Sequence, residues 1–124
     1  MVDLRLKSRQ WIVDEHDHII FGEGRREILE NIERSGSINQ TAKMMRMSYK
    51  AVWGKIKATE QHLNTRLVLT DRKKGAWLTD EGKEILEKYR LLKKRCLREE
   101  NRIFTSIFKP AMSRKNRHER KDGC

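Results

Sequence analysis

The first 21 residues alternate apolar and polar side chains imperfectly around a polar group. The polar group is residues 14–18, and the apolar positions that flank it are Leu4, Leu6, Trp11, Val13, Ile19, Ile20 and Phe21. Alternation with a period of two is typical of a strand that has one buried face. The pattern therefore predicts a β-hairpin with the polar group as its turn.

From Arg25 onward the apolar residues take the spacing of a helix. Ile28, Leu29 and Ile32 lie on one face, and the pattern stops at Gly36. Glycine readily adopts the left-handed conformation that commonly follows the last turn of a helix. We therefore expect a first helix that ends at residues 35–36.

A second, very short helix is predicted directly after the first. Ser37 and Gln40 have the S-x-x-Q spacing of a capping box, which marks a helix start. The residues expected on its buried face are Ile38, Ala42 and Met45. Residues 46–47 then form a tight turn.

A third helix follows that turn, because Ser48 is a favourable N-cap. The residues expected on its buried face are Val52, Ile56 and Leu63. Asn64 can end the helix, since Asn tolerates the left-handed conformation better than most residues. The second and third helices are thus predicted to form a helix-turn-helix unit.

Two short extended runs, residues 67–70 and 76–78, are joined by the basic segment 71–75, which predicts a second hairpin. Thr79 then caps a long helix whose first turn carries two acidic residues, a favourable placement against the helix dipole. Apolar side chains recur along this helix at spacings near three and four, at Ile85, Tyr89, Leu92, Cys96, Ile103 and Ile107. So long a stripe requires a partner, and these residues are the expected dimer interface.

These elements predict a mainly α fold with small β-hairpins, a winged helix-turn-helix with a long C-terminal dimerisation helix. Residues 1–79 are expected to form the winged helix-turn-helix with its N-terminal hairpin, and residues 80–108 the dimerisation helix. Residues 109–124 are polar, basic and without apolar pattern, so we expect a basic disordered tail.

Composition limits the class of protein. Only 36% of the 124 residues are hydrophobic against 38% charged, so the core is modest. No apolar run approaches the roughly 18 residues of a membrane span, and the N-terminus lacks a secretory signal, so we expect a cytoplasmic protein. Cys96 is expected to be a small core residue and Cys124 a tail thiol, too few for a disulfide framework or a zinc site.

The net charge of +11 is distributed unevenly. Residues 1–42 carry a net charge of −2, whereas residues 43–74 hold 9 basic and 2 acidic residues. A basic block of this kind can be a solvated face. Because it coincides with the predicted helix-turn-helix and its wing, we expect double-stranded DNA as the partner, since phosphates favour clustered Lys and Arg.

In a helix-turn-helix the N-terminal part of the second helix contacts base edges in the major groove. The expected DNA-binding residues are Ser37, Asn39, Gln40, Ser48, Tyr49, Lys50, Trp53, Gly54, Lys57, Arg72, Lys73 and Lys74. Lys50 can contact guanine or phosphate, and Gly54 lets the backbone approach closely. Trp53 can equally cover the core, and residues 72–74 can be a plain surface turn.

The segment GSINQTAKMMRMSYKAVWGKIKATEQHLNTRLVLTDRKKGAWLTDEG resembles the N-terminal DNA-binding domain of the ModE family of molybdate-responsive regulators, and more distantly LysR-type domains. The resemblance covers about residues 4–95 and rests on GSI at 36–38, SYKxxW at 48–53 and LTxxG at 78–82. The lead-in FGEGRREILENI at 21–32 is also similar. The resemblance implies a winged helix that dimerises and binds a palindromic operator.

The sequence departs from that family in three places. Arg46 stands where the family usually has Gly in the turn, the wing is shortened to DRKKGA, and no C-terminal oxyanion-binding domain follows. A left-handed Arg46 would cost about 1 kcal/mol. We therefore expect DNA binding without molybdate sensing, with no cofactor and no small-molecule effector.

The leading hypothesis is a dimeric, sequence-specific transcriptional regulator. An alternative is a winged-helix interaction module that docks a separate sensor or partner subunit through residues 97–108, which are more apolar than a free helix end requires. A third is metal or oxyanion sensing by the polar group 14–18, for which a polar turn is the ordinary explanation. We expect no metal site and no enzyme, because no catalytic triad or phosphate-loop pattern occurs.

Overall fold

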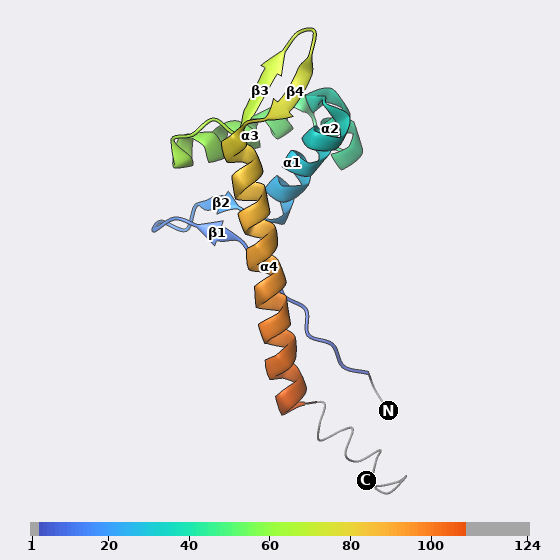
Figure 1. Ribbon diagram of the computed structural model, residues 1–124, viewed down its shortest axis with the longest axis vertical. Coiled ribbons are helices and arrows are strands. Elements are labelled where there is room, and N and C mark those ends of the chain that lie inside the picture. Colours follow the sequence, from blue (N-terminus) through green and yellow to red (C-terminus); the bar gives the residue numbers. More distant parts are fainter. Residues whose placement is uncertain (1–2, 109–124) are drawn as a thin grey trace, which may run out of the picture. The chain divides into compact units, whose positions relative to one another are not determined.

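The computed structural model describes residues 3–108, in which two antiparallel hairpins accompany four helices (Figure 1). The elements in chain order are β1 (Ile12–Val13), β2 (Ile19–Phe21), α1 (Glu23–Ser35), α2 (Ile38–Met45), α3 (Tyr49–Leu63), β3 (Val68–Asp71), β4 (Gly75–Leu78) and α4 (Asp80–Ile107). The predicted fold class, mainly helical with small hairpins and a long C-terminal helix, is confirmed. The basic tail predicted at residues 109–124 lies outside the described residues.

The described chain divides into two compact units. Residues 9–91 form the larger one, and residues 3–8 with 92–108 form the smaller one. In the smaller unit the Ser8 hydroxyl hydrogen-bonds the Glu100 carboxylate, and the N-terminal segment also lines a groove with Phe104 of α4. No helix in residues 3–108 is both long and apolar enough to cross a membrane.

The N-terminal hairpin is shorter than the apolar pattern predicted. Ile12 pairs with Phe21 and Val13 with Ile19, with a register shift between the two pairs. Leu4 lies outside the strands, as does Leu6. The polar group 14–18 forms the turn, as predicted.

The helix ends follow the predicted capping residues. Gly36 ends α1 with φ 70°, and Asn64 ends α3 with φ 52°, both in the left-handed region. The Ser37 side chain accepts a hydrogen bond from the Gln40 amide at 3.1 Å, which caps α2. Each of these signals lies within a few residues of the helix end that it fixes.

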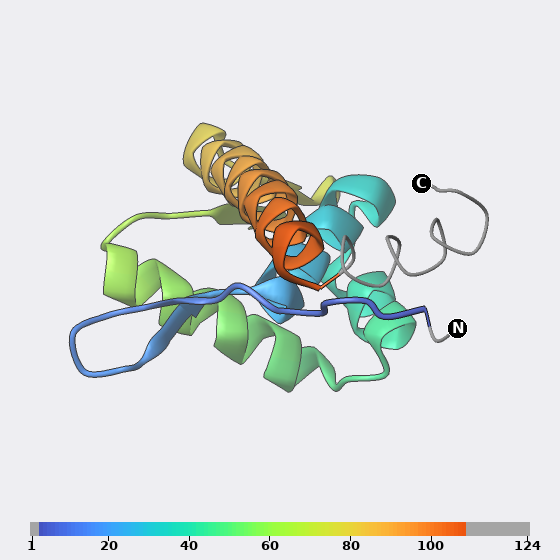
Figure 2. The same cartoon turned by 90° about the horizontal axis from the view of Figure 1, so that it is seen from below.

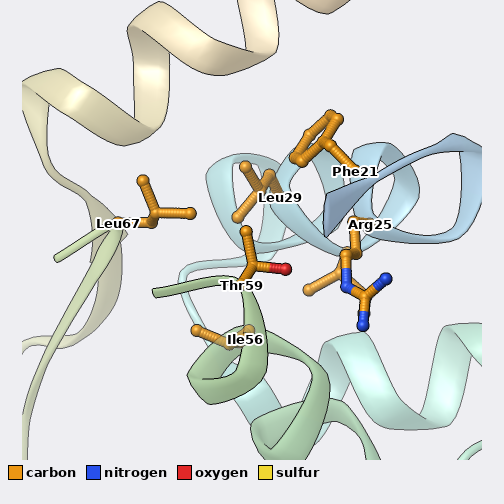
Figure 3. A pocket seen from close by; sticks show the side chains of 7 residues that line it. Phe21, Arg25, Leu29, Ile56, Thr59 and Leu67 are labelled. Atoms are coloured by element: carbon orange, nitrogen blue, oxygen red, sulfur yellow. The ribbon is translucent and has the colours of Figure 1, made fainter. Parts of the chain in front are cut away.

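The core of the larger unit is built from every element except β1. Its buried members are Phe21, Ile28, Leu29, Ile32, Ile38, Ala42, Val52, Ile56, Leu67, Val68, Ala76, Leu78, Leu86 and Tyr89. Met45 is only partly buried against this cluster. Figure 3 shows side chains of β2, α1, α3 and Leu67 around a cavity of about 10 Å³, which has room for about one water molecule and none for an effector.

The expectation that α3 buries Leu63 is wrong, since this side chain is 37% exposed. Thr59 and Glu60 are buried in its place. The physical reason is that α3 meets main chain here: the Thr59 hydroxyl donates to the Ile20 carbonyl at 3.0 Å, and Glu60 accepts backbone N–H groups of the segment that leads into β3. A surface of peptide groups is matched by polar side chains.

Tyr89 of α4, expected in the dimer interface, is instead 1% exposed in the core of its own chain. Its ring packs edge-on against Phe21 at 5.1 Å, and its hydroxyl lies 2.5 Å from the Gln10 carbonyl and 3.0 Å from a Glu23 carboxylate oxygen. Burial raises the pKa of Tyr89 to about 12, with the Glu23 contact adding to the shift. Tyr89 therefore closes the core and is not available to a partner.

Two other residues of the predicted stripe also differ from expectation. Ile85 is packed in part against the core, where Leu86 is the fully buried neighbour. Cys96 is half-buried and not a core residue. The apolar stripe of α4 thus serves its own chain in its first turns, and Leu92, Ile103 and Ile107 remain exposed further along.

Candidate nucleic-acid interface

The turn between α2 and α3 is fixed by main-chain hydrogen bonds. The Met47 amide donates to the Ala42 carbonyl at 2.9 Å, and Arg46 has φ 56°. Arg46 therefore keeps the left-handed geometry in which a glycine would be free of about 1 kcal/mol of strain. Ser48 follows and accepts a hydrogen bond from the Ala51 amide at 3.0 Å, so that α3 starts immediately after the turn.

The first turns of α3 present one face to the core and another to solvent. Val52 and Ile56 are buried, whereas Tyr49 is 48% exposed and Lys50 and Gly54 are exposed. A glycine within a helix costs about 1 kcal/mol relative to alanine. At Gly54 an added Cβ would meet nothing within 4 Å, so no contact inside the chain requires this glycine.

Trp53 and Lys57 are partly engaged within the chain. Trp53 packs in part against the core, and the Lys57 ammonium lies 4.7 Å from the centre of its ring. The same ammonium lies 3.4 Å from a Glu60 carboxylate oxygen. The covering role considered for Trp53 is thus present, and Lys50 is the freer cation of this face.

Predicted site residues from three elements line a single groove. Ser37 and Asn39 at the start of α2, Tyr49 at the start of α3, and Arg72 of the wing border a hollow of about 380 Å³. Gln40 is exposed at the start of α2 as well. Residues about 35 positions apart in the sequence are thus brought to one surface.

The wing is the β3–β4 hairpin, which projects beyond the helices of the larger unit in Figure 1. Asp71 pairs with Gly75, so the loop consists of Arg72, Lys73 and Lys74, all exposed. Within residues 3–108 none of these three cations forms an ion pair. Their charge is therefore available to a partner.

Glu60 is a structural residue of this surface that sequence reasoning missed. Its carboxylate accepts the Leu67 amide at 2.8 Å and the Val68 amide at 3.2 Å, and Arg66 approaches to 3.9 Å. Its burial leaves Asp71 as the one exposed acidic residue of segment 43–74. No local signal identifies Glu60, because its partners arrive from the next element.

Residues 25–83, which contain the helix-turn-helix and the wing, match the family described as "Bacterial regulatory helix-turn-helix protein, lysR family". This part of the chain is therefore a DNA-binding domain of the LysR type, as found in transcriptional regulators. The match agrees with the geometry of a short α2, a tight turn and an α3 that is exposed at its N-terminal end.

Two curated relatives sharpen this assignment. The chain is 41% identical over 69 residues to the "Molybdenum transport protein ModE" of Azotobacter vinelandii, covering 52% of this chain and 26% of that protein. It is 36% identical over 59 residues to the uncharacterized HTH-type transcriptional regulator YvbU of Bacillus subtilis (strain 168), covering 48% and 20%. The chain thus spans about a quarter of the first relative's length.

Solved structures share the fold. The DNA-binding domain in the CbnR_DBD–DNA complex has a TM-score of 0.55 at 20% identity, over 67% of this chain and 94% of that one. Full-length LysG from Corynebacterium glutamicum has a TM-score of 0.51 at 24% identity, over 67% and 29%. At these identities the likeness establishes the fold.

Proposed function

We propose that this protein is a sequence-specific DNA-binding transcriptional regulator of the ModE type that binds a palindromic operator as a dimer. The observation that carries the proposal is the exposed face of α3, with its freely placed Lys50 and Gly54, beside a wing of three unpaired cations. Neither feature has a role inside the chain. Both fit a helix that enters a major groove while a wing contacts phosphates.

Each part of this surface has a proposed role. Lys50 and Tyr49 read base edges or the adjoining phosphates, and Arg72, Lys73 and Lys74 bind phosphate. The residues that complete the interface are Ser37, Asn39, Gln40, Ser48, Trp53, Gly54 and Lys57. Ser37 and Ser48 place helix N-termini at the surface, where backbone N–H groups favour phosphate oxygens.

A gel-shift comparison tests the roles of the two kinds of lysine. The DNA is first selected from a random pool by the purified protein. We expect Lys50→Ala to relax base preference by about 1 to 3 kcal/mol, and Lys73→Ala to weaken all sequences alike. Lys88→Ala is the control, since Lys88 is exposed on α4 and paired with Glu84. Equal loss of affinity with unchanged preference in both variants would contradict the assignment of Lys50.

Gly54 offers a test that separates DNA contact from folding. We expect Gly54→Ala to stabilise the free protein by about 0.5 to 1 kcal/mol, because alanine favours a helix and the space is open. The added methyl group should nevertheless weaken specific DNA binding if the backbone approaches the bases. Gly24→Ala in α1 also meets nothing within 4 Å and is the matched control. Unchanged DNA affinity in Gly54→Ala would exclude close approach at this position.

The dimer is proposed to form through the exposed apolar side chains of α4. Leu92 is 40% exposed, Ile103 51% and Ile107 62%, and half-buried Cys96 lies on the same face of the helix. Two recognition helices would then contact major grooves about 34 Å apart on an inverted repeat. We propose this occupant because one winged helix has too few contacts to select a single site.

Leu92→Glu tests this interface by placing like charges next to each other at the two-fold axis. We expect folded monomers in sedimentation and loss of specific binding in a footprint. Leu91→Glu is the matched control, because Leu91 is 48% exposed but lies roughly 130° away from this stripe around the helix. A dimer that survives Leu92→Glu would favour the second candidate, a module that docks another protein through residues 97–108, where Phe108 is also exposed.

A further inference from the structure

Asp14 begins the turn of the N-terminal hairpin and divides its two carboxylate oxygens between different partners. Oδ1 accepts the backbone N–H groups of His16 and His18 at 2.8 and 2.9 Å. Oδ2 lies 3.1 Å from Nδ1 of His18 and 3.7 Å from Nε2 of His62. The His18 and His16 amides lower the pKa of Asp14 to about 2 against a smaller opposing effect of burial, so this carboxylate is ionised at neutral pH.

His62 comes from a different element, the last turn of α3. Its Nδ1 lies 2.8 Å from the Ala58 carbonyl, which can only accept a hydrogen bond. In the neutral ring Nδ1 therefore carries the proton and Nε2 directs its lone pair toward Asp14. A backbone carbonyl that fixes the ring in this way is typical of a metal-binding histidine.

The hairpin and α3 are held together one turn earlier, independently of the two histidines. Thr59 is buried and donates to the Ile20 carbonyl at 3.0 Å. Because His62 follows Thr59 by three residues, it lies on the same face of α3. Figures 1 and 2 both show the hairpin loop on the side where α3 ends.

We propose that Asp14, His18 and His62 bind one divalent transition-metal ion of the Zn²⁺ type, which joins the hairpin turn to the end of α3. Their ligand atoms lie within 4.8 Å of one another. A tetrahedral zinc with bonds of about 2.1 Å requires donors about 3.4 Å apart, which small rotations of two exposed imidazoles supply. Water completes the fourth position.

The donor set selects the class of ion. Two imidazole nitrogens and one carboxylate oxygen suit Zn²⁺, Co²⁺ or Ni²⁺, whereas Mg²⁺ and Ca²⁺ prefer oxygen ligands throughout. His18 and His62 are both exposed, so an ion can reach the site from solvent. The turn residues alone did not indicate this site, because His62 is 44 positions beyond His18 in the sequence.

The test is calorimetric titration of the full chain with ZnCl₂, in a Cys96→Ser, Cys124→Ser background so that thiols do not compete. We expect one zinc per chain and no heat with MgCl₂. His18→Gln and His62→Gln should each weaken zinc binding at least tenfold. His16→Gln removes a neighbouring histidine of the same turn and should leave the affinity unchanged.

Thermal unfolding with and without zinc supplies a second readout. Zinc should raise the Tm of the parent chain and of His16→Gln, but not that of His62→Gln. No stoichiometric binding would overturn the proposal, as would equal affinity in His62→Gln or an equal loss in His16→Gln. Neither readout involves DNA, so failure here is distinguishable from failure of the proposed regulatory function.

Discussion

The two β-hairpins of the larger unit share a topology but carry loops of opposite character. Both are two-stranded and antiparallel. The β1–β2 turn is acidic and histidine-rich, with a register shift in its short ladder, whereas the β3–β4 ladder is regular and its loop holds three cations. The strands set the position of each loop, and the loop residues decide what each hairpin can bind.

Neighbouring residues of α3 hold the two hairpins. The Thr59 hydroxyl donates to the main chain of β2, and the Glu60 carboxylate accepts main-chain N–H groups at and before the start of β3. Donor and acceptor are thus matched to opposite peptide groups. The comparison teaches that one short segment of a recognition helix can orient two hairpins, each through a polar side chain that is buried.

The largest expected effect is on the wing attachment. Glu60→Ala leaves two backbone N–H groups without their acceptor, and we expect a loss of about 2 to 4 kcal/mol in the free energy of unfolding. Urea denaturation measures it. Glu60→Gln keeps a carbonyl acceptor and should cost less than half as much. A cost below about 1 kcal/mol for Glu60→Ala would mean that the wing does not depend on this residue.

The next effect distinguishes the two turns. Gly75 has φ 87°, and a Cβ there would lie 2.2 Å from the Gly36 carbonyl oxygen, so Gly75→Ala should cost about 2 to 3 kcal/mol. Asp17 also has positive φ, at 66°, but Asp tolerates this region. Asp17→Gly should therefore change stability by less than about 1 kcal/mol in the same denaturation experiment. Similar costs at both positions would remove this difference between the hairpins.

A smaller effect is expected at the other anchor. Thr59→Val keeps the shape but leaves the Ile20 carbonyl without its donor, which should cost about 1 to 2 kcal/mol. Hydrogen exchange should accelerate in β1–β2 and stay unchanged in β3–β4. Thr70→Val on exposed β3 is the control. Faster exchange in both hairpins would show that the two anchors are not independent.

The smallest effect concerns the loops themselves. Lys74→Ala should lower the slope of log affinity for DNA against log salt by about 0.9, with a modest loss of affinity. Glu15→Gln, a charge change of the same size in the other loop, should leave the slope unchanged. If both variants shift the slope, the charge of the whole domain and not the wing governs DNA binding.

Features set by neighbouring residues could be predicted from the sequence. The caps at Ser37, Ser48 and Gly36 and the closure at Asn64 were correct, because each depends on backbone groups within a few positions. The groove that joins Ser37, Asn39 and Tyr49 to Arg72 agrees with the surface expected for a winged helix. Local chemistry thus fixes the elements, and the family pattern brings them together.

Features that depend on distant partners were missed. An apolar stripe does not reveal whether it faces its own core or another chain, so Tyr89 was assigned to a partner although it packs on Phe21. Burial of Glu60 in place of Leu63 was unexpected, because only tertiary structure supplies the peptide N–H groups that a carboxylate needs. The approach of His62 to Asp14 has the same origin.

The joint between the wing and α1 has an evolutionary consequence. The Ala76 amide donates to the Gly36 carbonyl at 2.9 Å, a bond between main-chain atoms at the point where α1 ends. Because no side chain takes part, substitutions at loop residues 72–74 can alter charge and reach without moving the joint. Variation can then adjust how the wing engages a new operator while the scaffold stays intact, provided that positions 36 and 75 remain glycine.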